Sequence, residues 1–437
     1  MKRSLLVFCC TAFLQPICFS QISSSQINGS NNLNTITTAV PFLMIAPDTR
    51  AGGMGEAGVS TSPDASSIHW NPAKLGFVEN DMAISVSYTP WLRKLVPDIS
   101  LSYLSGYKKL DKYTTVGASL LYFSLGDIQF TDEFGNQTIQ FRPNEYAIDI
   151  AVGRKLSEKF SGGFALRYIN SNLTGNINVG GASSKPGRAV AADVSLYYED
   201  NTKKLGDKKT TIAAGVNISN IGNKISYSST AKTDFIPINL RIGPRYTVNL
   251  DDYNKVTFTV DFNKLLVPTP PIYADSSGIP IKDENGNLQV AAGQDPNKAV
   301  ASGMFSSFGD APGTPVRDDK GNYVYNPDGT LQVKKGSVAA EEFREINYAV
   351  GVEYWYGKQF ALRGGYFWEH ALKGNRKFFT LGAGLRYNVF GLDFSYLFPA
   401  YFSANNTQRS PLENTLRFTL SFDFASLKKQ GEENVGN

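Results

Sequence analysis

The stretch "TLRFTLSFDF", residues 415–424, decides how the rest of the chain is interpreted. Large apolar side chains occupy every second position from Leu416 to Phe424, and polar ones, from Arg417 to Asp423, lie between them. Successive side chains of an extended chain point to opposite faces. The alternation therefore predicts a β-strand with one apolar face and one polar face.

The same alternation recurs along most of the chain, for example in "AISVSY" (83–88) and "EYAIDIAVG" (145–153). The apolar face often ends in tyrosine, at Tyr88, Tyr103, Tyr146, Tyr168, Tyr198, Tyr246, Tyr354, Tyr356, Tyr387 and Tyr396. The other face is small or charged, with Asp149, Arg167, Asp193, Arg241, Arg245, Asp261, Glu353, Arg363, Arg386, Asp393 and Arg417. In a soluble sandwich these charges would face solvent. Tyrosine at strand ends suits the headgroup level of a bilayer, which favours a membrane barrel.

The first residues, "MKRSLLVFCCTAFLQPICFSQ" (1–21), have the organisation of a secretory signal peptide. Basic residues start it, an apolar stretch from Leu5 to Leu14 follows, and we expect cleavage after Ser20. All three cysteines lie in this segment, so the mature chain is expected to contain none. No later stretch approaches the roughly 18 consecutive apolar residues of a transmembrane helix. The formal charge of +4 is too small to indicate the basic surface typical of a nucleic-acid-binding protein.

Counting the alternating segments predicts an all-β fold, a 14-stranded antiparallel transmembrane β-barrel. The predicted strands are 82–90, 98–107, 113–124, 144–154, 160–169, 189–199, 209–219, 237–249, 255–264, 346–357, 359–369, 377–388, 389–398 and 413–424. Short connections follow the even-numbered strands, including a turn over 200–209, and most of the others are long. Short turns face the periplasm in such barrels and long loops face outside. We therefore expect both termini in the periplasm.

The longest connection, residues 265–345, is too long for a plain loop. Two of its segments, "IPIKDENGNLQV" (279–290) and "YVYNPDGTLQV" (323–333), are typical of hairpins with tight turns. A third, "KAVASGMFSSF" (298–308), holds Met304, Phe305 and Phe308 beside small residues. We hypothesise that these three side chains form a partner-binding loop on the outer side. The alternative is that the segment only caps the barrel mouth.

A glycine-rich stretch before the first strand raises a separate possibility. Gly53, Gly55 and Gly58 have the G-x-G-x-x-G spacing of a dinucleotide-binding loop. Such a loop needs a strand before it, a helix after it and a βαβ unit around it. Pro47 and Pro63 interrupt those positions, and no βαβ pattern follows. We therefore reject nucleotide binding.

The same stretch resembles the N-terminal plug of the FadL-like barrels, in which glycine-rich chain and an Asn-Pro-Ala turn precede the first strand. The residues that carry this likeness are Arg50, Gly52, Gly53, Gly55, Gly58, Asn71, Pro72 and Ala73. Two longer blocks, "AVPFLMIAPDTRAGGMGEAGVSTSPDASSIHWNPAKLGF" (39–77) and "FALRGGYFWEHALKGNRKFFTLGAGLRYNVFGLDFSYL" (360–397), look like the PorV family of the type IX secretion system of Bacteroidetes. The related PorQ branch shares that fold.

The resemblance implies a non-enzymatic outer-membrane protein that binds the C-terminal domains of secreted cargo and shuttles them to the cell surface. Its implied partners are the translocon pore, the sortase-containing attachment complex, cargo and outer-membrane lipid. The corresponding organisation is a signal peptide at 1–20, a periplasmic segment and lumen plug at 21–80, a barrel at 81–426 with its extracellular insert at 265–345, and a tail at 427–437.

An enzyme and a small-molecule transporter are the two alternatives to this function. An enzyme would need a base beside a nucleophile, but the only histidines are His69 and His370, far apart in sequence, and neither suggests a catalytic or metal site. No catalytic residue, metal site or cofactor is expected. The main alternative is a FadL-type transporter of long-chain fatty acids or other hydrophobic small molecules. The charged face of the strands, expected to line the interior, argues against an apolar conduit.

Overall fold

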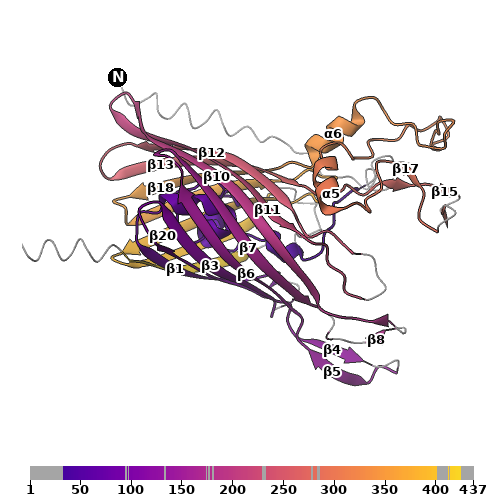
Figure 1. Ribbon diagram of the computed structural model, residues 1–437, viewed down its shortest axis with the longest axis horizontal. Helices are drawn as coiled ribbons and strands as arrows, with labels where there is room; N and C mark the ends of the chain where they lie inside the picture. The colour runs from indigo at the N-terminus through magenta and orange to yellow at the C-terminus, as the bar shows by residue number, and fades with distance from the viewer. Residues whose placement is uncertain are drawn as a thin grey trace, which may run out of the picture.

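The computed structural model describes residues 33–424, apart from 94–95, 97, 132–133, 174, 176–177, 180–181, 229–232, 277–278, 283–285, 401–411 and 413. The predicted signal peptide and C-terminal tail lie outside these residues. Fourteen strands form one closed barrel in which every neighbouring pair is antiparallel (Figure 1), and this confirms the predicted fold class. They are β1 (Met82–Pro90), β2 (Ser100–Lys109), β3 (Thr114–Ser124), β6 (Asn144–Lys155), β7 (Phe160–Asn172), β10 (Gly187–Leu205), β11 (Lys208–Gly222), β12 (Asn239–Asn249), β13 (Asn254–Leu265), β18 (Asn347–Tyr356), β19 (Phe360–Trp368), β20 (Lys377–Tyr387), β21 (Phe390–Pro399) and β22 (Thr415–Phe424).

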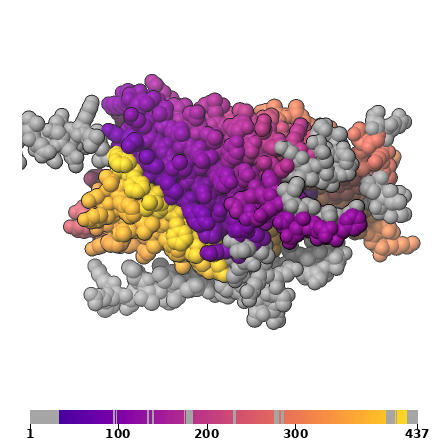
Figure 2. Space-filling view, turned by 90° about the horizontal axis from the view of Figure 1, so that it is seen from below, coloured from indigo at the N-terminus to yellow at the C-terminus, as the bar shows by residue number. Residues whose placement is uncertain are grey.

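The first and last strands close the barrel. β1 pairs with β2 on one side and with β22 on the other, where Ser87 lies opposite Thr419. Figure 2 shows the yellow C-terminal strands directly beside the indigo N-terminal ones. Closure leaves no unpaired strand edge, which a strand crossing lipid requires. Within the described residues, none of the helices has the length and apolar character needed to cross a bilayer.

The two ends of the barrel differ. At one, the turn end, β1 begins, β22 finishes and the hairpins are short. At the other, the insert end, lie the long connections, among them the insert itself, residues 266–346 between β13 and β18. The predicted alternation of short and long connections is therefore present. The turn predicted over 200–209 is wrong, because β10 continues to Leu205 and β11 starts at Lys208. Gly206, with φ 60°, lets the chain reverse within two residues.

Side chains alternate across the wall as the sequence predicted. In β1 the side chains of Ile84, Val86 and Tyr88 are 40%, 46% and 48% exposed on the outer face. The charged face points into the lumen, where Asp149, Arg167 and Arg417 are buried. The outward placement predicted for Tyr103 is wrong, because it points inward and is 1% exposed. Its ring packs against His69, 6.2 Å away, so the lumen and not lipid receives it.

Residues 39–78, the plug segment, lie within the barrel (Figure 1). They form four short helical turns: η1 (Pro41–Met44), α3 (Thr49–Gly52), α4 (Ser67–Trp70) and η2 (Pro72–Phe77). Toward the insert end, Phe42 and Leu43 pack with Leu101, Leu121 and Phe123 of the wall in the largest apolar cluster. The remainder of the segment contacts polar lumen side chains and smaller apolar clusters of the wall, such as the one that joins Ile68 and Leu75 to Ala151, so the lumen holds packed protein at this level.

The insert carries two helices that the sequence did not predict, α5 (Val300–Ser306) and α6 (Ser337–Arg344). At the two predicted hairpins the chain pairs through isolated antiparallel β-bridges, with Tyr325 opposite Leu331 and Lys282 opposite Leu288. Short strand pairs complete the loops at this end: β4 (Ile128–Thr131) with β5 (Gln137–Phe141), β8 (Asn178–Val179) with β9 (Ala182–Ser183), β14 (Ile272–Tyr273) with β17 (Val290–Ala292), and β15 (Asp275–Ser276) with β16 (Ile279–Pro280).

The described chain enters and leaves the barrel at opposite ends. The Asn34 amide donates to the carbonyl of Leu372 (3.1 Å), in the loop that follows β19, so it lies at the insert end. The last described strand, β22, finishes at the turn end. The sequence predicted both termini on one side. The described ends do not share a side, and residues 1–32 and 425–437 lie outside the description.

Candidate functional site

The glycine-rich stretch singled out in the sequence runs close along the inner wall. Gly55 has φ 68°, and a Cβ added there would lie 2.6 Å from the backbone nitrogen of Tyr366 in β19. Gly53 likewise approaches the backbone of Gly382, whereas Gly52 lies against the Arg417 side chain and Gly58 against the Trp70 ring. Gly53 and Gly55 therefore allow backbone to pack on backbone within the lumen.

The amides of this stretch bind a carboxylate of the barrel itself. Asp261, on the lumen face of β13, accepts hydrogen bonds from the amides of Gly58 (2.7 Å) and Val59 (2.8 Å). A dinucleotide loop would offer such amides to a phosphate. Here the anion comes from the wall, which gives the glycine spacing a structural role.

Arg50 fastens the plug segment to β18, the strand next to β13 in the wall. Its Nε and Nη2 donate to the two carboxylate oxygens of Glu353 in β18, at 2.9 and 2.8 Å. Its Nη1 also donates to Asp64 at 3.0 Å, within the plug segment. Glu353 is 1% exposed and accepts a further bond from Arg363 at 2.7 Å. A bidentate pair of this kind fixes both position and orientation.

The Asn-Pro-Ala turn fastens the other half of the segment. The Asn71 side chain accepts from the Ala73 amide (3.0 Å) and donates to the Val59 carbonyl (3.0 Å), while Pro72 begins η2. Ala73 is held between two strands, because its amide donates to Ser195 of β10 (2.9 Å) and its carbonyl accepts from Ser161 of β7 (2.6 Å). All the plug residues named from the sequence thus contact the wall or order the segment.

His69 lies in the plug segment but not in a catalytic arrangement. Its ring packs on Trp70 at 5.0 Å and on Tyr103 at 6.2 Å. The nearby Ser67 hydroxyl is bonded to Asp64 instead (3.3 Å). Within the described residues, no group of three or more His, Cys, Asp and Glu side chains is placed to hold a metal ion.

A second group of charged residues fastens the insert over the barrel mouth. Lys264, the last outward-facing residue of β13, donates to Glu345 (2.6 Å) and Glu342 (3.0 Å) at the end of α6. Lys373, in the loop after β19, donates to Glu345 (3.0 Å) and Glu341 (2.7 Å). Sequence reasoning missed this cluster, although the acidic run "EEFRE" (341–345) could have suggested a paired helix end.

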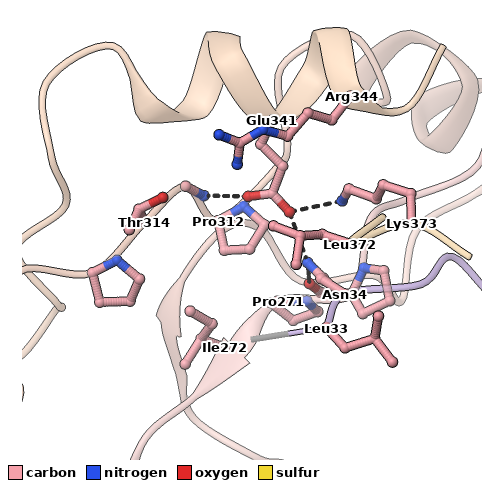
Figure 3. A pocket seen from close by; sticks show the side chains of 13 residues that line it. Leu33, Asn34, Pro271, Ile272, Pro312, Thr314, Glu341, Arg344, Leu372 and Lys373 are labelled. Carbon is pink, nitrogen blue, oxygen red and sulfur yellow. Dashed lines mark hydrogen bonds and ion pairs between the residues drawn. The ribbon is translucent and has the colours of Figure 1, made fainter. Parts of the chain in front are cut away.

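The first described residues join this cluster and line a pocket, shown in Figure 3. The Asn34 side chain donates to Glu341 and to the Pro270 carbonyl, both at 3.1 Å. The pocket has a volume of about 220 Å³ and is bordered by prolines, with Arg344 and Lys373 on its rim. It lies where three segments distant in sequence meet: the N-terminal arm, the insert and the loop after β19.

Burial changes the proton affinity of several groups at this mouth. It raises the pKa of Glu342 and of Asp310 above the ordinary carboxyl value. It lowers the pKa of His370 from 6.5 to about 4, and the nearby cations Arg344, Lys377 and Lys373 act in the same direction. His370 is therefore neutral at physiological pH, and its Nδ1 accepts a hydrogen bond from the Leu372 amide (3.1 Å).

The structure separates the three side chains named as a partner-binding loop. Met304 packs against the apolar cluster of the mouth and is only partly exposed. Phe305 is 79% exposed. Phe308 is 55% exposed and lines a groove against the barrel wall. The three side chains therefore differ in exposure, and their role in binding a partner stays a prediction.

Comparison with known proteins gives one family and one group of similar structures. Residues 28–272 match the model of the family described as type IX secretion system protein PorV. No curated protein sequence matches the chain. The chain is similar to the crystal structure of a Pseudomonas aeruginosa FadL homologue, at 10% identity and a TM-score of 0.43, over 90% of this chain and 99% of that one. The Pseudomonas putida toluene transporter TodX gives 12% identity and a TM-score of 0.42, over 89% and 98% of the two chains.

Proposed function

Because the chain belongs to the family of the type IX secretion system protein PorV, we propose that it binds the C-terminal domain of secreted cargo at the translocon pore and shuttles it to the sortase-containing attachment complex. In this role it is non-enzymatic and works in the outer membrane. The insert end faces the cell exterior, because long loops of such barrels lie outside.

The observation that carries the proposal is the state of the lumen. The plug segment is bonded to several strands, through Arg50 to Glu353, Asp261 to Gly58, and Ala73 to Ser195. A bidentate arginine–carboxylate pair fixes position and orientation, and we infer that a segment held in this way stays in place. A barrel with a filled lumen acts through its surface. The part of that surface available to partners is the insert end.

A variant in which the plug segment is covalently fixed to the wall distinguishes this role from transport through the lumen. The hydroxyls of Thr49 in α3 and Thr419 in β22 are 2.7 Å apart and both residues are buried. Replacing both with cysteine should give a disulfide, and the mature chain contains no other cysteine to compete. We expect the oxidised Thr49→Cys, Thr419→Cys double variant to secrete cargo at the wild-type rate, measured in the culture medium and on the cell surface.

The single Thr49→Cys and Thr419→Cys variants are the controls. Secretion that stops only in the oxidised double variant and returns on reduction would contradict the proposal. It would show that secretion itself requires movement of the plug segment. The alternative, a FadL-type transporter of hydrophobic small molecules, predicts that the oxidised double variant loses uptake while secretion is unchanged, because passage of a small molecule requires movement in the lumen. The observation that favours this alternative is the apolar cluster around Phe42 and Phe123 in the insert-end half of the lumen. Uptake of a labelled long-chain fatty acid by the same variants tests it directly.

We propose further that α5 provides a contact for the secretion machinery or for cargo, with Phe305 at its centre. Phe305 is 79% exposed on a helix outside the strands, and burial of such a ring against a partner would be favourable. Phe305→Ser should lower the amount of translocon pore that co-purifies from detergent-solubilised membranes. The matched control is Tyr253→Ser, which removes an aromatic ring that is 66% exposed at the turn end. Equal co-purification in both variants would contradict a contact at α5.

A further inference from the structure

A groove lies between the insert and the outer face of the barrel. Its floor is the barrel wall, with Leu240 and Ile242 of β12 and Phe262 of β13. Its roof is the insert, with Phe308 and with Phe343 of α6. The remaining lining residues are Asn263, Lys264, Ala339, Glu342 and Ile346. The volume of about 360 Å³ is within the range of small-ligand sites.

The floor of the groove belongs to the face that contacts lipid. Ile242 and Phe262 are 43% and 42% exposed, and the residues beside them in sequence, Arg241 and Asp261, are buried in the lumen. The groove is therefore continuous with the outer apolar band of the barrel. A hydrocarbon chain could enter it from the bilayer without meeting a polar barrier.

Aromatic contacts place the groove at the edge of the hydrocarbon region. Phe262 packs on Tyr348 at 5.6 Å between ring centres, and Tyr348 packs on Trp368 at 5.3 Å. Rings of this kind gather at the headgroup level of membrane barrels. The roof is thus held where acyl chains join their headgroups.

The charged side chains in the lining form ion pairs and hydrogen bonds with other residues of the protein. Lys264 is paired with Glu342 and Glu345, and Glu342 also accepts from the Ala311 amide at 3.0 Å. Asn263 accepts a hydrogen bond from Arg241 at 2.6 Å. The charged side chains of the lining thus have partners within the protein, and most of the other lining side chains are apolar, so the lining suits an apolar ligand.

From this continuity and this lining we propose that the groove binds one acyl chain of a lipid in the leaflet beside the insert. The roof, α6 with Phe308, separates that chain from the surrounding bilayer. The ion pairs of Lys264 hold the roof at a fixed distance from the wall. The bound chain would anchor the insert to the membrane surface, in addition to the charged contacts at the mouth.

The test uses a phosphatidylcholine that carries a diazirine in the middle of one acyl chain, with the full-length mature protein in vesicles. After illumination, labelled peptides are identified by mass spectrometry. We expect label on residues 337–346 and on Phe308, in addition to the general band of the barrel. Ile242→Trp fills the floor and should lower the labelling of 337–346 several-fold, while labelling around Phe418 on another part of the wall stays unchanged.

The matched control is Ile212→Trp, the same replacement at a residue that is 40% exposed on β11 and outside the groove. Phe343→Lys is a second variant, placed on the exposed roof and therefore not expected to disturb the barrel, and it should give the same loss. Heat-modifiable gel migration confirms that each variant is folded. The proposal is overturned if 337–346 carries no label in the wild type, or if Ile242→Trp and Ile212→Trp behave alike.

A protein occupant is tested in whole outer membranes with p-benzoylphenylalanine in place of Phe343. An adduct of lipid mass is expected. A cross-link of protein mass at this position would overturn the proposal in favour of a partner subunit.

Discussion

At the scale of single residues, the plug segment shows that a chemical motif can have a purely structural use. Gly53, Gly55 and Gly58 have the spacing of a nucleotide-binding loop, but their amides bind the protein itself. The Gly58 amide donates to Asp261 of the wall, the Gly55 amide to the Thr380 hydroxyl, and the Gly53 amide to the Thr49 carbonyl. Proximity to backbone is the constraint at Gly55, which lies against Tyr366 in a left-handed conformation. The residue therefore combines a conformational requirement with a steric one.

Gly55→Ala should destabilise the barrel more than a glycine replacement that meets only the conformational requirement. The left-handed conformation costs roughly 1–2 kcal/mol for a residue with a Cβ, and the contact with Tyr366 adds strain to this. Gly206→Ala, in a turn with φ 60° and no atom within 4 Å of the added Cβ, is the control. We expect the urea midpoint of the folded band on unheated gels to fall clearly for Gly55→Ala and slightly for Gly206→Ala. Equal midpoints would mean that the close approach of the plug is not needed.

At the scale of elements, the sequence predicts the strands, because the alternation of their side chains matches the two different faces of the barrel wall. Each strand has lipid on one side and a polar lumen on the other, so the period-two alternation marks all fourteen. Tyr103 was assigned to the wrong face because the lumen also contains an apolar cluster, which the sequence does not distinguish from lipid. The helices α5 and α6 are short, and residues distant in sequence hold them: Lys264 and Lys373 pair with α6, and α5 packs on the apolar cluster of the mouth. A local pattern therefore does not predict them.

The loop after β19 should be sensitive to pH. His370 has a folded-state pKa of about 4, below its ordinary value of 6.5, so the unfolded loop binds the proton more readily. The stabilisation is therefore complete above about pH 6.5 and is lost as the pH falls toward 4. Protonation also removes the acceptor of the Leu372 amide. The raised pKa values of Glu342 and Asp310 act with the opposite sign in the insert.

Hydrogen exchange, corrected for intrinsic rates, measures this effect. Protection of the Leu372 and Lys373 amides should fall between pH 7 and pH 5. The Leu110 amide, bonded to the Thr114 carbonyl in a turn without histidine, serves as the reference. Protection that is the same at both pH values in all three amides would contradict the assignment.

At the scale of the whole molecule, the described chain begins at the insert end and finishes at the turn end, with the plug segment between the start and the first strand. This follows from the position of Asn34 beside Leu372 and Glu341. The sequence does not predict this path. The alternation of short and long connections fixes the direction of the strands, but it contains no information about the chain before the first strand. The domain organisation inferred from the sequence, with a periplasmic segment and lumen plug at 21–80, stays a prediction, and within it Asn34 lies at the insert end.

Surface labelling of intact cells tests the orientation. Leu33 at the insert end and Tyr253 at the turn end are 65% and 66% exposed, and residues 21–437 contain no cysteine. We expect Leu33→Cys to react with a membrane-impermeant maleimide in whole cells, and Tyr253→Cys to react only after the outer membrane is permeabilised. The reverse pattern would place the insert in the periplasm and would remove the basis for assigning α5 to surface partners.

The position of the plug segment also bears on how the protein is assembled. The segment precedes every strand, yet Thr49 and Arg50 bind Thr419 and Glu353, which come from the last third of the chain. A segment enclosed on all sides cannot enter after β1 and β22 have joined, unless it threads through the opening. The strands are therefore expected to assemble around it. Contacts made early with the segment would bring the late strands near the first one and lower the entropy cost of closing so long a loop. In this view residues 39–78 are a template on which the barrel is built.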